Sequence, residues 1–153
     1  MKRPLSLCLS LSLSALATAE ILNVPSSYET IQGGIDAAST GDIVLVAPGA
    51  YFEVIDFLGK AITVRSEAGP EETSIKAPTA TAASTVTFNS KESSAARFEG
   101  FRVGGGRGTV ISDPIFGVAI VGGAVFCSDS HPIIEGCEFV ANAVGNNDQI
   151  GLG

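Results

Sequence analysis

One pattern decides the fold and occurs twice: Phe98-Glu99-Gly100-Phe101-Arg102-Val103 and, 36 residues later, Ile134-Glu135-Gly136-Cys137-Glu138-Phe139. Each copy has an apolar residue, then Glu-Gly, then an apolar–charged–apolar triplet. Because alternate side chains of a strand face the same side, the first apolar residue of each copy would face away from the last two in one continuous strand. A single apolar core therefore requires a corner at Gly100 and Gly136, and glycine tolerates the backbone angles of a corner.

The same corner in two copies predicts a stack of repeated coils, each burying its apolar side against its neighbours. Short strands are expected at residues 21–24, 43–47, 54–58, 61–65, 74–76 and 86–88. The segment before each corner aligns Phe88-Asn89-Ser90 with Phe126-Cys127-Ser128. A glycine-rich loop, residues 104–117, is expected to project from the first copy, and residues 118–126 are expected to resume the wall.

A short helix is expected at residues 28–38, before the second strand. Ser26-x-x-Glu29 is a capping-box pattern, and Gly41 is a suitable stop. One face of this helix is apolar, with Ile31, Ile35 and Ala38. Residues 43–47 are apolar on both parities, so we expect the helix to cover the outer face of that strand.

Residues 1–19 have the pattern of a signal peptide. Lys2 and Arg3 precede a short run of leucine and serine, and Ala17-Thr18-Ala19 fits a cleavage site. Removal of this segment would change the formal net charge from −7 to −9, because it carries two positive and no negative side chains. The expected location is outside the cell or on its surface. The acidic balance argues against nucleic acid and anionic membranes as partners, and no transmembrane segment follows.

Two cysteines, Cys127 and Cys137, remain in the mature chain. Export would allow them to form a disulfide, whereas the core parity of Cys137 favours a buried free thiol. The spacing leaves both states open.

Three stretches of this chain resemble exported right-handed parallel β-helix proteins of the pectin-lyase-like superfamily. Residues 28–51 and 59–66 are similar to the N-terminal cap and first coil of these proteins, and residues 127–137 look like their coil repeat. The resemblance implies an all-β fold, a right-handed parallel β-helix (solenoid) with a short N-terminal capping helix. It implies no particular activity, since the superfamily holds lyases, hydrolases, esterases and proteins with no assigned chemistry.

Pectin methylesterases share the Thr-Ile-Gln of residues 30–32 and a Gly-x-Tyr-x-Glu turn, matched here by residues 49–53. The segment from Asp113 to Gly117 superficially resembles one that carries a catalytic aspartate in those enzymes. The glutamine motifs that should precede it are absent, so we interpret this match as coincidence.

Residues 20–153 are therefore expected to form an N-terminal cap and about four coils. No C-terminal cap is recognisable after residues 146–149, so the chain is expected to be the N-terminal part of a longer protein. Its last coil would expose open strand edges, which favour edge-to-edge self-association.

Several charged and aromatic side chains allow two interpretations. Arg102 and Glu138 should lie side by side on adjacent coils, as a surface ion pair or as part of a sugar-binding wall. Glu99 and Glu135 should stack likewise, as two solvated carboxylates splayed apart or as ligands of Ca²⁺. His131 is expected to be a solvated turn residue. Three aromatic side chains could pack in the core or form platforms for sugar rings: Tyr51, Phe52 and Phe116. Five cationic residues are scattered along the sequence with no cluster of acidic residues beside them: Lys60, Lys76, Lys91, Arg97 and Arg107.

No constellation of catalytic, cofactor-binding or metal-binding residues emerges from the sequence, and no cofactor is expected. The sequence therefore favours an exported β-helix module that binds glycans or partners, or serves as a surface scaffold, without chemistry of its own. The alternative is the N-terminal part of a polysaccharide lyase or hydrolase whose active site lies beyond residue 153.

Overall fold

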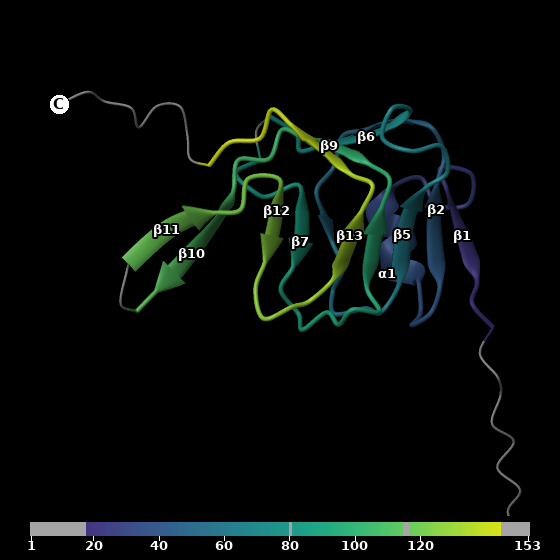
Figure 1. Ribbon diagram of the computed structural model, residues 1–153, viewed down its shortest axis with the longest axis horizontal. Coiled ribbons are helices and arrows are strands. Elements are labelled where there is room, and N and C mark those ends of the chain that lie inside the picture. The colour runs from purple at the N-terminus through teal and green to yellow at the C-terminus, as the bar shows by residue number, and fades with distance from the viewer. Residues whose placement is uncertain (1–17, 80, 115–116, 145–153) are drawn as a thin grey trace, which may run out of the picture.

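The computed structural model describes residues 18–79, 81–114 and 117–144, and in this part of the chain it is mostly β-structure with one α-helix (Figure 1). The elements are β1 Ile21–Val24, α1 Ile31–Ala37, β2 Ile43–Val46, β3 Gly49–Tyr51, β4 Ile55–Asp56, β5 Thr63–Ser66, β6 Thr73–Lys76, β7 Val86–Phe88, β8 Arg97–Glu99, β9 Arg102–Gly104, β10 Thr109–Asp113, β11 Gly117–Val121, β12 Val125–Cys127, β13 Ile133–Glu135 and β14 Glu138–Val140.

Most of these strands belong to three parallel sheets. Their strand orders are β1-β2-β5-β8-β13, β3-β6-β9-β14 and β4-β7-β12. From β2 onward the chain adds a strand to each of the three sheets in turn, so the connection between two neighbouring parallel strands runs through the other two sheets. The expectation of short stacked strands is confirmed to this extent.

The two glycine corners are where the sequence pattern predicted them. Gly100 lies between β8 and β9 with φ of 77°, and Gly136 lies between β13 and β14 with φ of 60°. Both values fall in the left-handed region that side chains with a Cβ avoid. The turn allows Phe98, Phe101 and Val103 to be fully buried together although their parities differ.

The core is a stack of apolar side chains from the inward positions of successive passes. The register places Leu22, Val44, Val64 and Phe98 in one row across the first sheet, and each of them is buried. Aromatic rings fill the centre: the rings of Phe98 and Phe101 stack with centroids 4.7 Å apart, and those of Phe57 and Phe88 lie 4.4 Å apart. Burying one such side chain stabilises the fold by roughly 1.5–3 kcal/mol.

Helix α1 begins at Ile31, so the predicted capping box at Ser26–Glu29 is wrong. Thr30 is the N-cap, and its hydroxyl accepts a hydrogen bond from the N–H of Gly33 at 3.0 Å. Gly41 has φ of 95° but lies beyond the C-cap, which is Ala38. The predicted buried face, Ile31 with Ile35 and Ala38, is confirmed.

The helix covers the inward face of the sheet, which corrects the expectation that it covers the outer face. A Cβ atom on Gly34 would lie 2.8 Å from Val44 Cγ1 and 3.3 Å from Val24 Cγ2, both of which belong to inward, buried side chains. The glycine permits close packing of helix and sheet. On the outer face, Ile43 and Leu45 remain half-buried.

A two-stranded antiparallel hairpin, β10–β11, replaces the predicted loop at residues 104–117. It projects from the body of the molecule, at the left of Figure 1. Residues 118–121 belong to this hairpin, so the expectation that residues 118–126 resume the wall is wrong except for β12. Thr109, which was expected in the loop, pairs with Val121, which was expected in the wall.

The register of β12 differs by one residue from the sequence alignment. Cys127, rather than Phe126, pairs with Phe88, and Phe126 pairs with Thr87. Val125-Phe126-Cys127 is apolar on both parities, so alternation does not fix the register, and a shift of one residue exchanges the two faces of a strand.

Other strand predictions agree with the structure to different degrees. Residues 21–24 and 86–88 are confirmed, whereas residues 54–58 contain only the two-residue strand β4 and β5 begins two residues after the predicted start at 61. The predicted signal peptide lies outside the described residues except for Thr18 and Ala19.

Candidate functional site

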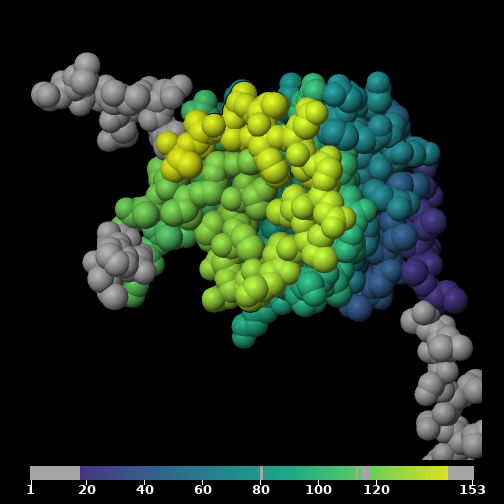
Figure 2. Space-filling model, viewed as in Figure 1, coloured from purple at the N-terminus to yellow at the C-terminus, as the bar shows by residue number. Residues whose placement is uncertain are grey.

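The described part of the chain ends in an open pass made of β12, β13 and β14. Each of these strands is the last in its sheet, paired on one side with the preceding pass and with no partner strand among the described residues on the other. Figure 2 shows this face, on which the green and yellow atoms of the last pass surround a hollow that opens onto the teal atoms of the pass before. Unpaired strand edges are templates for pairing with another chain.

Apolar side chains line the hollow. Its volume is ≈ 460 Å³, and its lining is Ala124, Val125, Ile134 and Phe139. Phe139 is 50% exposed, although Val103 at the same position one pass earlier is fully buried. The sequence predicted the inward parity of Phe139 correctly, but the exposure depends on what lies above it.

The two cysteines lie at the same open end as free thiols. Cys127 pairs in register with the buried Phe88, and Cys137 directly precedes the pair of Glu138 with Arg102, which places it over Phe101. Burial raises the pKa of both thiols, and the nearby negative charge of Glu92 raises that of Cys127 further. Both groups are therefore protonated at neutral pH.

Arg97 bridges the stacked carboxylates Glu99 and Glu135, which corrects the expectation that these splay apart in solvent. Arg97 Nε lies 2.5 Å from Glu99 Oε1, and Arg97 Nη2 lies 2.7 Å from Glu135 Oε2. The hydrogen bond with Glu99 raises the pKa of the guanidinium. The arginine thus relieves the repulsion for which a calcium ion was considered. The described residues contain no group of three or more side chains suited to holding a metal ion.

The predicted pair of Arg102 and Glu138 is confirmed. Arg102 Nη2 lies 2.8 Å from Glu138 Oε2, and Glu71 Oε2 of an earlier turn lies 3.5 Å from the same nitrogen. Both carboxylates are substantially exposed. Pairs of this kind contribute roughly 0–1 kcal/mol.

Glu92 is a buried carboxylate that the sequence reading did not single out. Its side chain accepts hydrogen bonds from Gly59 N at 2.8 Å, Ser90 N at 2.9 Å and Ser130 Oγ at 2.6 Å. Burial alone would raise the pKa of this carboxyl, but these hydrogen bonds outweigh it and lower the pKa below its ordinary value. The polar turn Ser90-Lys91-Glu92-Ser93 gives no signal that Glu92 is buried, because two of its three donors, Gly59 and Ser130, come from the preceding and following passes.

Glu53 and Lys60, from the turns that follow β3 and β4, cap the two ends of helix α1. The carboxylate of Glu53 accepts hydrogen bonds from Ile31 N at 3.0 Å and Gln32 N at 2.9 Å. At the other end, Lys60 Nζ donates to the carbonyl oxygens of Ile35, Asp36 and Ala38 at 2.7, 2.8 and 2.9 Å. The turns that contain Glu53 and Lys60 therefore stabilise the two ends of the helix, and both residues have a structural role.

The remaining predicted residues are not brought together. His131 is exposed, and its backbone N–H donates to the carbonyl oxygen of Glu92 at 2.7 Å, as suits a turn. Tyr51 is half-buried and donates from its hydroxyl to the carbonyl oxygen of Ala47, whereas Phe52 is 69% exposed. Phe116 lies outside the described residues.

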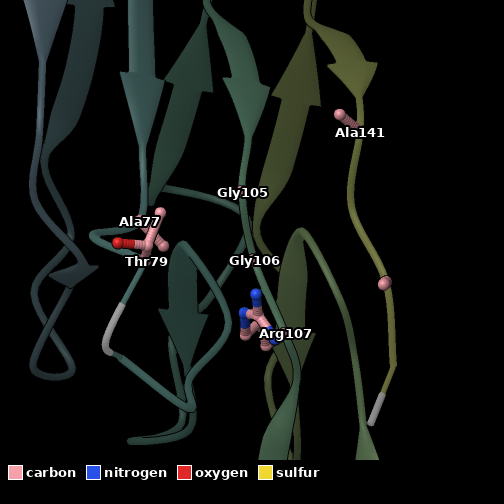
Figure 3. Close-up of a pocket in the computed structure, with 7 residues that line it drawn as sticks. Ala77, Thr79, Gly105, Gly106, Arg107 and Ala141 are labelled. Atoms are coloured by element: carbon pink, nitrogen blue, oxygen red, sulfur yellow. The ribbon is translucent and has the colours of Figure 1, made fainter. Parts of the chain in front are cut away.

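A small pocket of ≈ 200 Å³ lies on the wall beside β9 and β14 (Figure 3). Its lining consists mainly of glycine and alanine, with Thr79 and Arg107 as the polar side chains. Figure 3 shows Gly105 and Gly106 between Thr79 and Ala141. Arg107 forms no ion pair with any described residue.

Comparison with protein-family models, with curated proteins and with solved structures finds no match to this chain. Among the described residues, no helix has the length and apolar character needed to cross a membrane.

Proposed function

We propose that this chain is an exported, right-handed parallel β-helix module that acts by binding a partner macromolecule, with the open pass of β12, β13 and β14 as its binding surface. The parallel sheets that gain one strand per pass support the β-helix. The signal-like residues 1–19 support export. The handedness follows the strong general preference of parallel crossover connections.

The observation that carries the proposal is the contrast between equivalent positions of successive passes. Ile134 is 36% exposed where Phe98 is fully buried, and Phe139 is 50% exposed where Val103 is fully buried. Covering such side chains gains about 25 cal/mol for each Å² of apolar surface removed from water. The unpaired strand edges add directional hydrogen bonds, so a partner with a strand edge of its own fits this surface.

The dye 1-anilinonaphthalene-8-sulfonate, which binds exposed apolar surface, tests whether this end is the binding surface. Phe139→Asp is expected to lower the dye fluorescence of the reduced, dilute protein, because the aspartate places in the hollow a negative charge that repels the anionic dye. Phe52→Asp is the matched control, since Phe52 is 69% exposed elsewhere on the molecule. Equal fluorescence for both variants would show that the open pass is not the apolar binding surface.

Glycan binding along the wall is a second candidate function, and Arg107, the charged side chain that lines the small pocket, favours it. A glycan array probed with the native chain and with Arg107→Ala tests this. We expect acidic glycans to be retained by the native chain alone, because the guanidinium is the pocket's charged group. Retention by both proteins, or by neither, would remove this candidate.

Whether residues 1–153 have lyase activity of their own is tested separately. Incubation with polygalacturonate, followed by the absorbance of unsaturated products, detects a lyase. A signal from the chain as given would contradict a module that acts by binding alone.

A further inference from the structure

We propose that the partner is a second copy of this chain, joined through the same open pass about a two-fold axis, with Cys127 beside Cys137 of the partner subunit. This inference rests on the proposed function. It identifies the partner and the arrangement, and it explains why two free cysteines lie at the open end.

The direction of the strands favours a two-fold arrangement. All strands of the three parallel sheets follow the chain around the stack in one sense. A two-fold axis perpendicular to the stack reverses that sense in the second copy, so the edges that meet are antiparallel. When that axis passes through β13, the strand β14 meets β12 of the partner subunit, and β13 meets its own copy. This is an isologous contact, which closes after two copies.

Helix α1 disfavours the head-to-tail alternative. At the other end of the stack, α1 packs against β1, β2 and β4 and covers the inward side chains Val24 and Val44. A second copy placed there would meet the helix in place of an open core. The apolar surface exposed around the hollow is found on the side of β12, β13 and β14.

The alternation of side chains brings the cysteines together. Val125 and Cys127 share the inward parity on β12, and Phe139 and Cys137 share it around β14. Val125 and Phe139 line the same hollow, so with the axis through β13 the proposed contact sets Val125 of one copy opposite Phe139 of the other. In an antiparallel pair, the register that sets Val125 opposite the partner's Phe139 also sets Cys127 opposite the partner's Cys137. The two-fold axis produces this pair twice.

The distance between opposite residues suits a disulfide. Directly opposite Cβ atoms in antiparallel strands lie about 4.5–5.5 Å apart, and a disulfide needs about 3.5–4.5 Å, so a small adjustment of the strand edge suffices. Each bond forms when one deprotonated thiol attacks a small disulfide such as oxidised glutathione and the second thiol then displaces the attached glutathione. Two protein protons and two electrons leave per bond, and two molecules of reduced glutathione result. An oxidising compartment outside the cytosol favours this product.

The test uses the full chain with Cys8→Ser, so that Cys127 and Cys137 are its remaining thiols. Under reducing conditions, sedimentation velocity is expected to show a dimer for this protein and for its Phe52→Lys variant, and a monomer for its Phe139→Lys variant. With oxidised glutathione the dimer is expected to become covalent on non-reducing gels. Peptide mapping is expected to identify the Cys127–Cys137 link.

Two single variants show whether the link joins unlike cysteines of two chains. Cys127→Ser alone and Cys137→Ser alone are expected to remain free of covalent dimer, whereas an equimolar mixture of the two is expected to form one. Covalent dimer from either single variant at the same level would indicate unspecific oxidation and overturn the proposal. A Cys127–Cys137 bond within one chain, detected as an oxidised monomer, would overturn it as well.

The dye experiment tests the binding surface, and the sedimentation experiment tests the identity of the partner, so the two proposals can be contradicted separately. If dye binding depends on Phe139 while the protein is monomeric at every concentration, the open pass binds a partner other than a second copy. If dye binding does not depend on Phe139, the proposed function itself fails.

Discussion

Glu92 shows how one side chain joins turns that belong to different passes of the chain. Gly59 lies in the turn before it, Ser90 in its own turn and Ser130 in the turn after it, and all three donate to its carboxylate. Hydrogen bonds to charged groups are about twice as strong as those between neutral groups. Because Glu92 is 1% exposed, no solvent replaces these partners.

Replacement of this carboxylate is expected to weaken the whole stack. Glu92→Gln keeps the size of the side chain but turns an NH₂ group toward backbone donors, so the free energy of unfolding should fall by about 3 kcal/mol. Urea denaturation measures the change. Glu67→Gln is the matched control, since Glu67 is exposed, and its effect should stay within about 0.5 kcal/mol. Similar losses in both variants would contradict the role assigned to Glu92.

The lowered pKa values of Glu92 and Asp42 predict a loss of stability in acid. Asp42 accepts hydrogen bonds from Glu20 N and Ser39 N, and these lower the pKa of its carboxyl. The stabilisation is complete above the ordinary values of 4.5 for Glu92 and 3.8 for Asp42, because both states are then ionised. As pH falls through the lower folded-state values, the unfolded state binds more protons and the free energy of unfolding decreases.

Urea midpoints measured from neutral to acidic pH test this dependence. The decline of stability in acid should be shallower in Glu92→Gln, which has lost one of the two groups. An unchanged slope in this variant would show that Glu92 has an ordinary pKa in the folded chain.

At the scale of elements, helix α1 depends on side chains that arrive from later turns. It has only seven residues and contains Gly33 and Gly34, each of which costs about 1 kcal/mol relative to alanine in a helix. Glu53 satisfies N–H groups at its start, and Lys60 satisfies carbonyl groups at its end. The negative and positive charges also match the two ends of the helix dipole.

Removal of either cap is expected to loosen the helix selectively. Lys60→Met should lower the free energy of unfolding by about 1–2 kcal/mol and increase hydrogen exchange of the α1 amides, because three carbonyl groups lose a charged donor. Lys76→Met is the matched control, because Lys76 is exposed and forms no ion pair with a described residue. The assignment fails if exchange in α1 is the same in the two variants.

At the scale of the molecule, the effect of a substitution on the free energy of unfolding depends on whether a further pass of the chain covers the substituted residue. Val103→Lys should lower the free energy of unfolding by about 4 kcal/mol, since it buries a charge between two passes. Phe139→Lys, at the same register position in the next pass, should cost less than about 1 kcal/mol in the dilute, reduced protein, where its site is open. Urea denaturation distinguishes the two. Equal losses would mean that the open pass is covered in solution.

The candidate site was predictable in part. The Glu-Gly corners, the inward parity of Phe139 and Cys137 and the pair of Arg102 with Glu138 follow from alternation and repeat alone. The bridging role of Arg97 and the burial of Glu92 were not predictable, because Glu135 and Gly59 reach them from other passes at positions that the repeat does not place opposite them. The hairpin β10–β11 was missed because the glycines of this segment suggested a loop. The two strands are defined by their antiparallel pairing with each other, which the glycine content does not indicate.

The sequence by itself determined the local rules of this protein: which residues alternate, where Gly100 and Gly136 turn the chain, and that short parallel strands repeat. These properties depend on steric limits and hydrophobic periodicity within a few residues. Tertiary structure alone decided the start of α1, the inward position of the helix, the register of β12 and the exposure of the last pass. Each of these features depends on which residues of another pass lie within hydrogen-bonding or packing distance, and a local sequence pattern does not determine such contacts.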